Sequence, residues 1–318
     1  MTKFDPNAAA TGGGIFGLPH SPANARVVLV PVPFEATTSY GGGTSNGPRA
    51  ILQASRQVDL FDLETGKPYE QGIAMLEESP DVRAWDLGAR TAAAHVIAAG
   101  GTHGDPALLG AAATVDAHTE KMNAWVRATV ELFLERGKIV GTIGGDHSVS
   151  FGAIEAHARR WPGLGILHVD AHADLRRAYE GFTWSHASIM DNVVERIPQM
   201  ARLVQVGIRD LCEEEHERIA SSGGRIRTFF DSELAEARFA GETWGQQTLR
   251  ILETLPQDVY VSFDIDGLDP TLCPHTGTKV PGGLSTEWDE NVAARLLYKL
   301  IGWCLRSLLS GTSRTRAE

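Results

Sequence analysis

Carboxylates and an imidazole alternate in one short stretch of the sequence, Gly165-Ile-Leu-His-Val-Asp-Ala-His-Ala-Asp-Leu-Arg176. Its first half is apolar and β-branched, which predicts a buried parallel strand. Asp170, His172 and Asp174 follow at every second position, and on an extended backbone such residues point to the same side. Charges that converge at the end of a buried strand are costly when nothing neutralises them. The spacing therefore predicts a bound cation.

Two later motifs strengthen this interpretation, Gly144-Gly-Asp-His-Ser148 and Ser262-Phe-Asp-Ile-Asp-Gly-Leu-Asp-Pro270. The first presents a histidine on a tight loop, and the second repeats the alternating carboxylates after an apolar run. Asp269 precedes a proline, which is common turn chemistry, and we give it no ligand role. The six candidate metal ligands are His147, Asp170, His172, Asp174, Asp264 and Asp266.

The ligand types indicate which cation to expect. Oxygen ligands with some imidazole suit Mn²⁺ better than a soft-ligand site, with Zn²⁺, Fe²⁺, Co²⁺ and Ni²⁺ as alternatives. Six ligands are too many for one zinc ion, but they suit two divalent cations roughly 3.5–4 Å apart that share carboxylates. Such a pair lowers the pKa of a water to about 7, which makes hydroxide accessible at neutral pH. The sequence thus predicts a two-metal hydrolytic site.

Strands and helices alternate around these motifs. Apolar runs predict strands at 26–33, 138–143, 164–170, 201–208, 225–230 and 259–263. Helical patterns occupy 49–56, 106–136, the segment through 160, and segments near 213–221 and 241–255. This alternation predicts an α/β fold with a mostly parallel sheet covered on both faces, whose ligands gather at the strand ends. Residues 57–105 carry weaker signals.

Domain organisation and two misleading motifs complete the pattern. Residues 1–25 are rich in Gly, Ala, Pro and Asn and predict an irregular arm, and 26–318 show no linker, which predicts one domain. The glycine-rich loop at 41–47 lacks the residue order of a phosphate-binding loop, so we expect it at the edge of a pocket.

Val115-Asp-Ala-His118 repeats four residues of the central motif, but we expect it to face solvent on a helix. We expect His168 on the opposite strand face, in the core.

Composition excludes several classes of function. The formal net charge of −11 argues against nucleic-acid or anionic-membrane partners. Cys212, Cys273 and Cys304 lack the spacing of a disulfide framework or a zinc knuckle, which indicates a reducing compartment. The N-terminal residues lack an apolar signal region, and no apolar run reaches about 18 residues. We therefore expect a cytoplasmic protein.

From about residue 27 to Ser285, the three acidic motifs in this order resemble the ureohydrolase family of arginases and agmatinases. The resemblance implies a three-layer α-β-α fold and two manganese ions. It assigns His147, Asp170, Asp174 and Asp264 to one ion, and Asp170, His172, Asp264 and Asp266 to the other. The implied reaction is attack of a metal-activated water on a guanidinium carbon, with collapse to urea and an amine. The resemblance also implies a homo-oligomer, a trimer or a hexamer.

The resemblance assigns further roles. Asp174 would also hydrogen-bond the attacking hydroxide, and His186, in Ser185-His-Ala-Ser188, matches the histidine that protonates the leaving amine. Arg176 stands where arginases carry a small polar amide that holds the amino acid end of the substrate. The chain resembles the agmatinase branch instead, so we expect hydrolysis of the linear amidine C–N bond of agmatine, giving putrescine. Guanidinobutyrase, guanidinase and arginase activities remain alternatives, the first if Arg176 faces the pocket rather than an acid such as Glu180.

The resemblance breaks after Ser285. The family continues with a helix and with a strand bearing a glutamate that holds the guanidinium, whereas here the terminal helix follows almost at once. We therefore expect a domain shortened between 285 and 291. A member that keeps the metals without catalysis is the competing interpretation. A metal-dependent deacetylase would want paired histidines, which the chain lacks.

Overall fold

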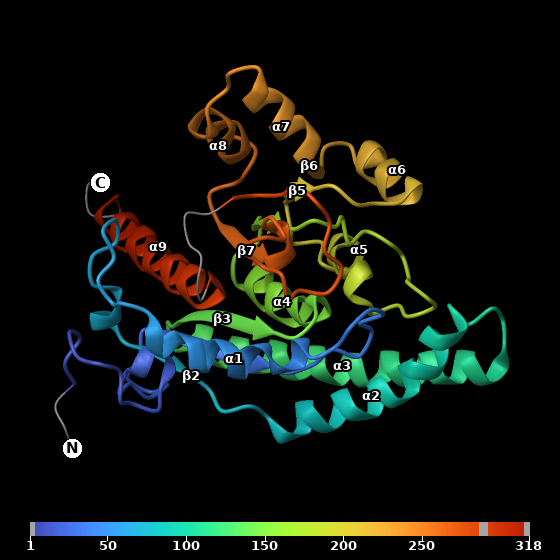
Figure 1. Ribbon diagram of the computed structural model, residues 1–318, viewed down its shortest axis with the longest axis horizontal. Coiled ribbons are helices and arrows are strands. Elements are labelled where there is room, and N and C mark those ends of the chain that lie inside the picture. Colours follow the sequence, from blue (N-terminus) through green and yellow to red (C-terminus); the bar gives the residue numbers. More distant parts are fainter. Residues whose placement is uncertain (1–3, 286–291, 315–318) are drawn as a thin grey trace.

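The computed structural model describes residues 4–285 and 292–314 (Figure 1). Every strand pairing within them is parallel. The described strands are β1 (Val27–Val32), β2 (Ile73–Met75), β3 (Ile139–Gly144), β4 (Gly165–Val169), β5 (Arg202–Ile208), β6 (Ile226–Phe230) and β7 (Val259–Phe263). They form two sheets, with strand orders β2-β1-β3 and β6-β5-β4-β7. The predicted α/β fold with parallel strands is confirmed.

Helices connect the strands. They are α1 (Gly47–Ala54), α2 (Pro80–Ala99), α3 (Pro106–Glu135), α4 (Ser150–Arg160), α5 (Ile189–Arg196), α6 (Glu213–Ser221), α7 (Asp231–Phe239), α8 (Trp244–Leu252) and α9 (Val292–Arg314). Helix α3 has nearly the predicted bounds because both of its ends are capped. Asp105 caps the first turn, and Gly137, with a φ of 69°, follows the last turn. None of the described helices is long and apolar enough to cross a membrane.

The first sheet is covered on both faces. Val28 and Val30 of β1 pack in a cluster with Val115 of α3, on the side where α2 and α3 lie. The alternate residues of the strand, Val27 and Leu29, pack in another cluster with residues of α9. That second cluster also takes in Ile15, Phe16 and Leu18 of the N-terminal segment, and the Phe16 ring meets the Tyr298 ring edge-on at 4.8 Å. The period of two along β1 thus builds three layers.

The second sheet follows the same rule. Ile166 of β4 and Leu203 of β5 pack with residues of α4 and α5. Val204 and Val206, the alternate residues of β5, pack with Leu234 of α7 and with α8. Each sheet is therefore the middle layer of an α-β-α arrangement, as predicted.

The two sheets meet at β3 and β7 without backbone pairing between these strands in the described chain. Side chains make the connection instead: Tyr260 of β7 contacts the side chain of Thr142 of β3. The sequence does not predict that the strands separate into two sheets between β3 and β7. The expected shortening of the domain falls on residues 286–291, which lie outside the described residues.

Candidate active site

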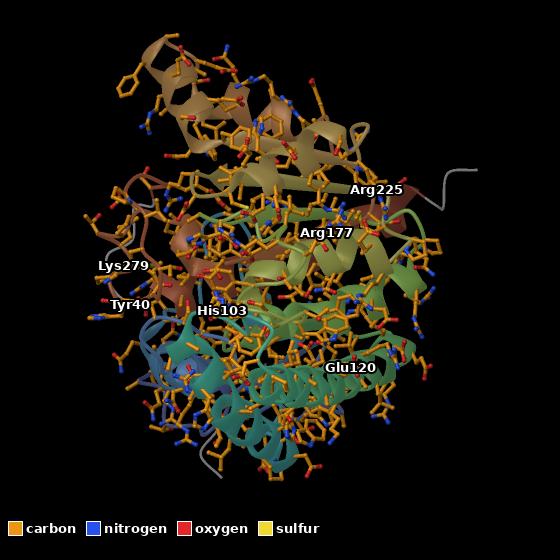
Figure 2. The ribbon with its side chains drawn as sticks, turned by 90° about the vertical axis from the view of Figure 1, so that its right-hand side faces the viewer. Tyr40, His103, Glu120, Arg177, Arg225 and Lys279 are labelled. Carbon is orange, nitrogen blue, oxygen red and sulfur yellow. The ribbon has the colours of Figure 1, made fainter. Side chains whose placement is uncertain are left out.

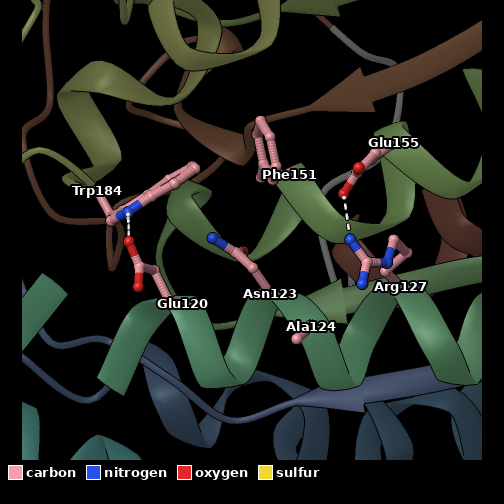
Figure 3. A pocket seen from close by; sticks show the side chains of 7 residues that line it. All are labelled: Glu120, Asn123, Ala124, Arg127, Phe151, Glu155 and Trp184. Atoms are coloured by element: carbon pink, nitrogen blue, oxygen red, sulfur yellow. Dashed lines mark hydrogen bonds and ion pairs between the residues drawn. The ribbon is translucent and has the colours of Figure 1, made fainter. Parts of the chain in front are cut away.

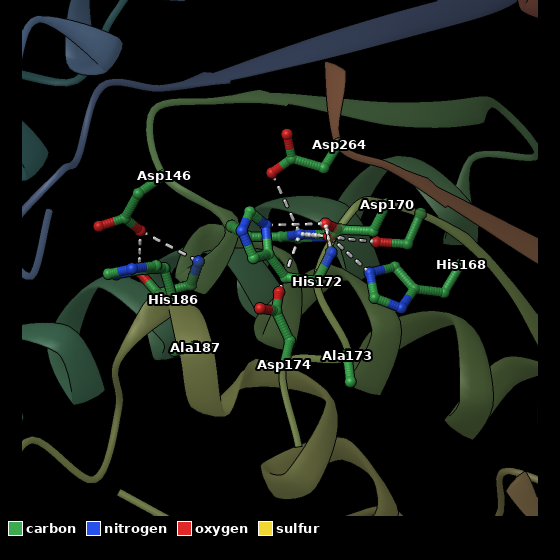
Figure 4. Close-up of polar contacts among 12 residues, drawn as sticks. Asp146, His168, Asp170, His172, Ala173, Asp174, His186, Ala187 and Asp264 are labelled. Carbon is green, nitrogen blue, oxygen red and sulfur yellow. Dashed lines mark hydrogen bonds and ion pairs between the residues drawn. The ribbon is translucent and has the colours of Figure 1, made fainter. Parts of the chain in front are cut away.

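The candidate metal ligands lie at the carboxyl ends of three strands. His147 follows β3, Asp170 follows β4, and Asp264 follows β7. β4 and β7 are neighbours, with Val169 opposite Phe263, so their terminal carboxylates emerge side by side. Parallel strands end at one edge of a sheet, and motifs far apart in the sequence therefore converge there (Figure 4).

One group of polar atoms surrounds the ring of His147. Its Nδ1 lies 2.9 Å from a carboxylate oxygen of Asp170, 3.2 Å from one of Asp174 and 3.4 Å from one of Asp264. Its Nε2 lies 2.8 Å from the hydroxyl of Ser262, which holds the ring from the side of β7. The structure thus brings together the four side chains expected around the first cation.

A second group forms around His172. Its Nδ1 lies 3.1 Å from Asp266 Oδ2 and 3.5 Å from Asp170 Oδ1. The backbone N–H of His172 donates to Asp170 Oδ1 at 2.7 Å, and that of Asp266 donates to Asp264 Oδ1 at 3.0 Å. Asp170 therefore contacts both groups, through Oδ2 toward His147 and through Oδ1 toward His172. This is the placement that a carboxylate shared between two cations requires.

The side chains of Asp170, His172 and Asp174 converge at the end of β4, but the expectation that an extended backbone brings them together is wrong at Asp174. β4 ends at Val169, and Asp174 adopts a left-handed backbone with a φ of 54°. Its carbonyl oxygen accepts hydrogen bonds from Met190 N at 3.0 Å and from Asp191 N at 3.2 Å, at the start of α5. A turn fixed by α5, rather than an extended strand, aims the Asp174 carboxylate at His147.

The expected orientation of His168 is also wrong, although the residue is fully buried as predicted. His168 and Asp170 are two positions apart and share a face, and His168 Nε2 lies 2.8 Å from Asp170 Oδ2. Burial lowers the pKa of His168, which favours the neutral ring. Gln205 Nε2 lies 3.0 Å from Nδ1, so Nδ1 accepts a hydrogen bond and Nε2 can donate one to Asp170. Partners of this kind orient metal-binding carboxylates.

The electrostatics of the cluster fit divalent cations. Burial and the charge of Asp170 raise the pKa of Asp174 to about 7, and burial with the charge of Asp264 raises that of Asp266 to about 8. Burial opposes protonation of His172, but its carboxylate partners raise its pKa to about 11. Without cations, protons must therefore neutralise this cluster. The ligand atoms of two groups lie within 4.8 Å of one another, His147, His168, Asp170 and Asp174 in one, and Asp170, His172 and Asp266 in the other. Such a donor set suits two divalent cations.

His186 lies beside the cluster, in a short turn that leads into α5. Its Nδ1 is 3.0 Å from the hydroxyl of Thr37, and its backbone N–H donates to the same oxygen at 3.2 Å. Burial lowers the pKa of His186 despite the nearby charge of Asp146. Thr37 is 1% exposed and follows β1, another strand that ends at this edge. Sequence reasoning missed Thr37, and its place after a strand end is the signal that could have revealed it.

The misleading motif on α3 is not wholly solvent-facing, which corrects that expectation. The carboxylate of Asp116 turns toward the segment before His186 and accepts hydrogen bonds from Trp184 N at 3.1 Å and Thr183 N at 3.3 Å. Glu120, one helical turn further, accepts from Trp184 Nε1 at 3.2 Å. Helix α3 therefore holds the loop that presents His186. These contacts span more than 60 residues of sequence.

Arg176 is held by an acid other than the expected Glu180. Its Nε lies 3.7 Å from the carboxylate of Glu215, and its guanidinium lies 5.2 Å from the centre of the Tyr179 ring. Glu215 is 3% exposed and also accepts from Leu175 N at 2.9 Å. The Tyr179 ring in turn meets the His186 ring at 6.0 Å. Arg176 thus pairs with a buried acid and stacks on Tyr179, beside His186.

The glycine-rich loop at 41–47 is organised by one buried carboxylate. Glu35 Oε2 accepts from Gly43 N at 2.7 Å, Thr44 Oγ1 at 2.9 Å and Ser45 N at 3.1 Å. Arg90 of α2 donates to the carbonyl oxygen of Glu35 at 2.9 Å. The loop therefore wraps a protein carboxylate.

Comparisons with known proteins agree with this arrangement. A model of the Arginase family matches residues 25–302. The chain is 34% identical over 272 residues to an N(1)-aminopropylagmatine ureohydrolase of Synechocystis sp., covering 85% of this chain and 76% of the relative. It is 30% identical over 287 residues to an agmatinase of Bacillus anthracis, covering 90% and 82% of the two chains.

Among solved structures, the agmatine ureohydrolase of Thermoplasma volcanium has a similar fold. The TM-score is 0.65 at 21% identity, and the match covers 91% of this chain and 93% of that one.

Proposed function

Because the chain belongs to the arginase family of ureohydrolases, we propose that it is a two-metal hydrolase that releases urea from agmatine and leaves putrescine. The observation that carries this proposal is the convergence of three His/Asp motifs beside His186. Without cations, protons must neutralise the carboxylate charges of this cluster. In the overall reaction, one water is added to the guanidinium group, and the products are urea and an ammonium group. The reaction also needs a residue that accepts and donates a proton.

The cations would be held by the two side-chain groups described above. One ion would be held by His147, Asp170, Asp174 and Asp264, and the other by Asp170, His172, Asp264 and Asp266, with Mn²⁺ preferred and Ni²⁺ as an alternative. When bound, such a pair supplies Lewis acidity and lowers the pKa of water. His168 orients Asp170 through the 2.8 Å contact to Oδ2.

Two residues would handle protons. The carboxylate of Asp174 accepts a hydrogen bond from the attacking water and keeps it oriented. The ring of His186, held at Nδ1 by Thr37, carries a proton to the leaving amine nitrogen. Burial disfavours the charged imidazolium and keeps the resting ring neutral, so the ring can accept a proton released by the attacking water and pass it to the amine nitrogen, returning to the neutral form.

The surroundings of Arg176 support a substrate with a cationic tail. A free guanidinium at this position would repel an ammonium group and would favour the carboxylate of guanidinobutyrate. The 3.7 Å pairing with Glu215 reduces that bias, and the stacking on Tyr179 holds the guanidinium in place. Agmatine therefore becomes the better substrate, in agreement with the chain's net charge of −11.

N(1)-aminopropylagmatine is a second candidate substrate. The relative of that name is 34% identical over most of this chain, a higher identity than the 30% of the Bacillus anthracis agmatinase. The molecule carries the same guanidinium end as agmatine and a longer cationic tail. The pairing of Arg176 with Glu215 lowers the repulsion that either cationic tail would meet.

The expected shortening after Ser285 bears on the rate. A guanidinium in a dry site gains about 1.5–3 kcal/mol from a charge-assisted carboxylate pair. Loss of the family's glutamate should therefore cost roughly 10- to 150-fold in kcat/KM, at about 1.4 kcal/mol per tenfold. We propose that this chain binds its metals and turns over slowly.

The test is a urea-release assay on the Mn²⁺-loaded chain with agmatine, N(1)-aminopropylagmatine, guanidinobutyrate and arginine. We expect slow release from the two amines, less from guanidinobutyrate and least from arginine, and none from the Asp264→Asn variant. A chain with a family-type helix–strand segment inserted after Ser285 should be faster. Metal binding without urea from any substrate, in either chain, would favour the non-catalytic alternative.

A further inference from the structure

Polar contacts outside the metal cluster are of two kinds. Some lie at the surface, such as the ion pair of Arg127 and Glu155 in the open groove between α3 and α4, with Nη1 3.1 Å from Oε2 (Figure 3). Figure 2 shows the exposed side chains of Arg177 and Lys279. Water competes for such groups, and surface ion pairs contribute only about 0–1 kcal/mol. Contacts of the second kind are fully buried, and one series of them leads into the metal cluster.

A row of buried polar side chains crosses three strands of the second sheet. His168 of β4 lies opposite Gln205 of β5, which lies opposite Thr228 of β6. The three residues are 0%, 0% and 3% exposed. Gln205 Nε2 lies 3.0 Å from His168 Nδ1, and Thr228 Oγ1 donates to Gln205 Oε1 at 2.9 Å. Because His168 Nε2 lies 2.8 Å from Asp170 Oδ2, the row joins β6 to a candidate metal ligand.

This polar row stands where packing alone would favour apolar side chains. The paired positions two residues earlier on the same strands are Ile166, Leu203 and Ile226, and all three belong to the hydrophobic cluster that the sheet forms with α4 and α5. Burying an imidazole, an amide and a hydroxyl costs free energy unless each group finds a partner. A buried network whose members are satisfied holds its side chains in one arrangement. The row begins two residues before Asp170, so the arrangement it fixes is that of the metal cluster.

A backbone carbonyl determines which way the Gln205 amide faces. Gln205 Nε2 donates to the carbonyl oxygen of Ala173 at 2.7 Å, in addition to its contact with His168. A carbonyl oxygen only accepts hydrogen bonds, so the reversed amide would place Gln205 Oε1 against it. His168 Nδ1 therefore accepts from Gln205. The hydrogen of the ring then lies on Nε2, which donates to Asp170 Oδ2.

Both partners of the Gln205 amide nitrogen adjoin metal ligands. The ring of His168 meets the ring of His147 edge-on, with centroids 5.1 Å apart and planes at 63°. Ala173 directly precedes Asp174, whose left-handed turn aims its carboxylate at the cluster. A displacement of the Gln205 amide would therefore reach these ligands through His168 and Ala173.

We propose that Gln205 is a positioning residue for the metal ligands, because its amide fixes the direction of the hydrogen bond from His168 to Asp170. The same amide holds the turn that carries Asp174, and Thr228 keeps the amide in place. This role rests on the proposed function for its metals, but not on the identity of the substrate. It also gives β5 and β6, which carry none of the candidate ligands, a part in the site.

Mn²⁺ binding to the full chain without substrate tests this role. Gln205→Met keeps the length of the side chain and removes its polar atoms, and Thr228→Val removes only a hydroxyl. Loss of a partner that orients a ligand costs about 10- to 100-fold in metal affinity. Gln205 acts through one further residue, so Gln205→Met should raise the Kd of at least one Mn²⁺ about 5- to 20-fold. Thr228→Val should raise it by a smaller factor. Isothermal titration calorimetry measures the Kd.

Gln247→Met is the matched control. Gln247 is 2% exposed, and its Nε2 donates to the carbonyl oxygen of Leu234 at 2.8 Å, but it lies on α8, which packs on the opposite face of the sheet. Both methionine variants should lower the thermal midpoint, whereas only Gln205→Met should weaken Mn²⁺ binding. An unchanged Kd in the folded Gln205→Met chain, or an equal rise in Gln247→Met, would overturn the proposal.

The His168 ring gives a second measurement in the unaltered protein. In the full metal-free chain labelled with ¹⁵N-histidine, long-range ¹⁵N–¹H correlation spectra show which ring nitrogen carries the hydrogen. We expect it on Nε2, and a hydrogen on Nδ1 instead would refute the proposal whether or not Gln205→Met folds. A chain with the expected difference between Gln205→Met and Gln247→Met that releases no urea would contradict the proposed function and still support this role.

Discussion

Thr37 holds His186 at two points: its hydroxyl oxygen lies 3.0 Å from His186 Nδ1 and accepts the backbone N–H of His186 at 3.2 Å. The two residues are 149 positions apart in the sequence. One side chain thereby fixes both the backbone and the ring of the residue that we propose as proton donor. The position of the ring beside the cluster depends on a residue of the loop after β1 that belongs to none of the predicted motifs.

Replacing Thr37 with valine should slow the reaction without removing metal. A net hydrogen bond contributes about 0.5–1.5 kcal/mol, so we expect kcat to fall roughly 2- to 13-fold, together with a shifted pH profile. The neighbouring Thr38 is the matched control, because its buried hydroxyl has no hydrogen-bond partner among the described residues. Thr38→Val should leave kcat and the profile unchanged. Equal effects of the two valines would contradict a specific role for Thr37.

The metal ligands give a second prediction. The chain loaded with Mn²⁺ should hold two ions, and His147→Asn or Asp264→Asn should remove at least one, because His147 belongs to a buried group of four possible ligands and an Asp264 carboxylate oxygen lies 3.4 Å from His147 Nδ1. His95→Asn, at an exposed position on α2, is the control and should keep both ions. Elemental analysis after gel filtration measures the ratio. A single ion in the wild type would refute the two-metal assignment.

The cluster should couple stability to pH. Folding raises the pKa of Asp174 to about 7, of Asp266 to about 8 and of His172 to about 11, so the metal-free folded chain binds more protons than the unfolded chain above pH 6.5. The free energy of unfolding therefore falls as pH rises from 6.5 to 8. Cations need the deprotonated ligands, and Mn²⁺ should raise the thermal midpoint more at pH 8 than at pH 6.5. Thermal scans at both pH values, with and without Mn²⁺, measure this, and a larger metal effect at pH 6.5 would contradict it.

Arg176 supplies a prediction about substrate choice. Arg176→Ala removes a cation near the site and should shift the ratio of kcat/KM values further toward agmatine over guanidinobutyrate. The shift should stay below about tenfold, because the side chain is 37% exposed and already paired with Glu215. Metal content should not change. The adjacent, exposed Arg177 is the control, and Arg177→Ala should leave the ratio as it is. An unchanged ratio in Arg176→Ala would show that this residue does not sense the substrate's tail.

Local sequence determined the elements and the chemistry they carry. The run Val259–Phe263 forms β7 with the predicted bounds, and the polar helix predicted near 213–221 is α6. Both follow from periodicity, which depends on neighbours within one turn or one strand. The spacing of Asp170, His172 and Asp174 indicated a bound cation, because these charged side chains need a counter-charge whenever the backbone brings them together. By contrast, β2, α2 and α7 lacked a sufficiently clear local pattern.

Tertiary structure decided everything that depends on distant partners. The left-handed turn at Asp174 is fixed by backbone donors of α5, and Asp116 turns inward because the segment before His186 offers it two N–H groups. Neither Thr37 nor Glu215 stands in a motif, yet each satisfies a residue of the site. The division between β3 and β7 likewise depends on which strands become neighbours. A sequence pattern records the preferences of adjacent residues, whereas these contacts exist only after the chain has brought segments tens to hundreds of residues apart together.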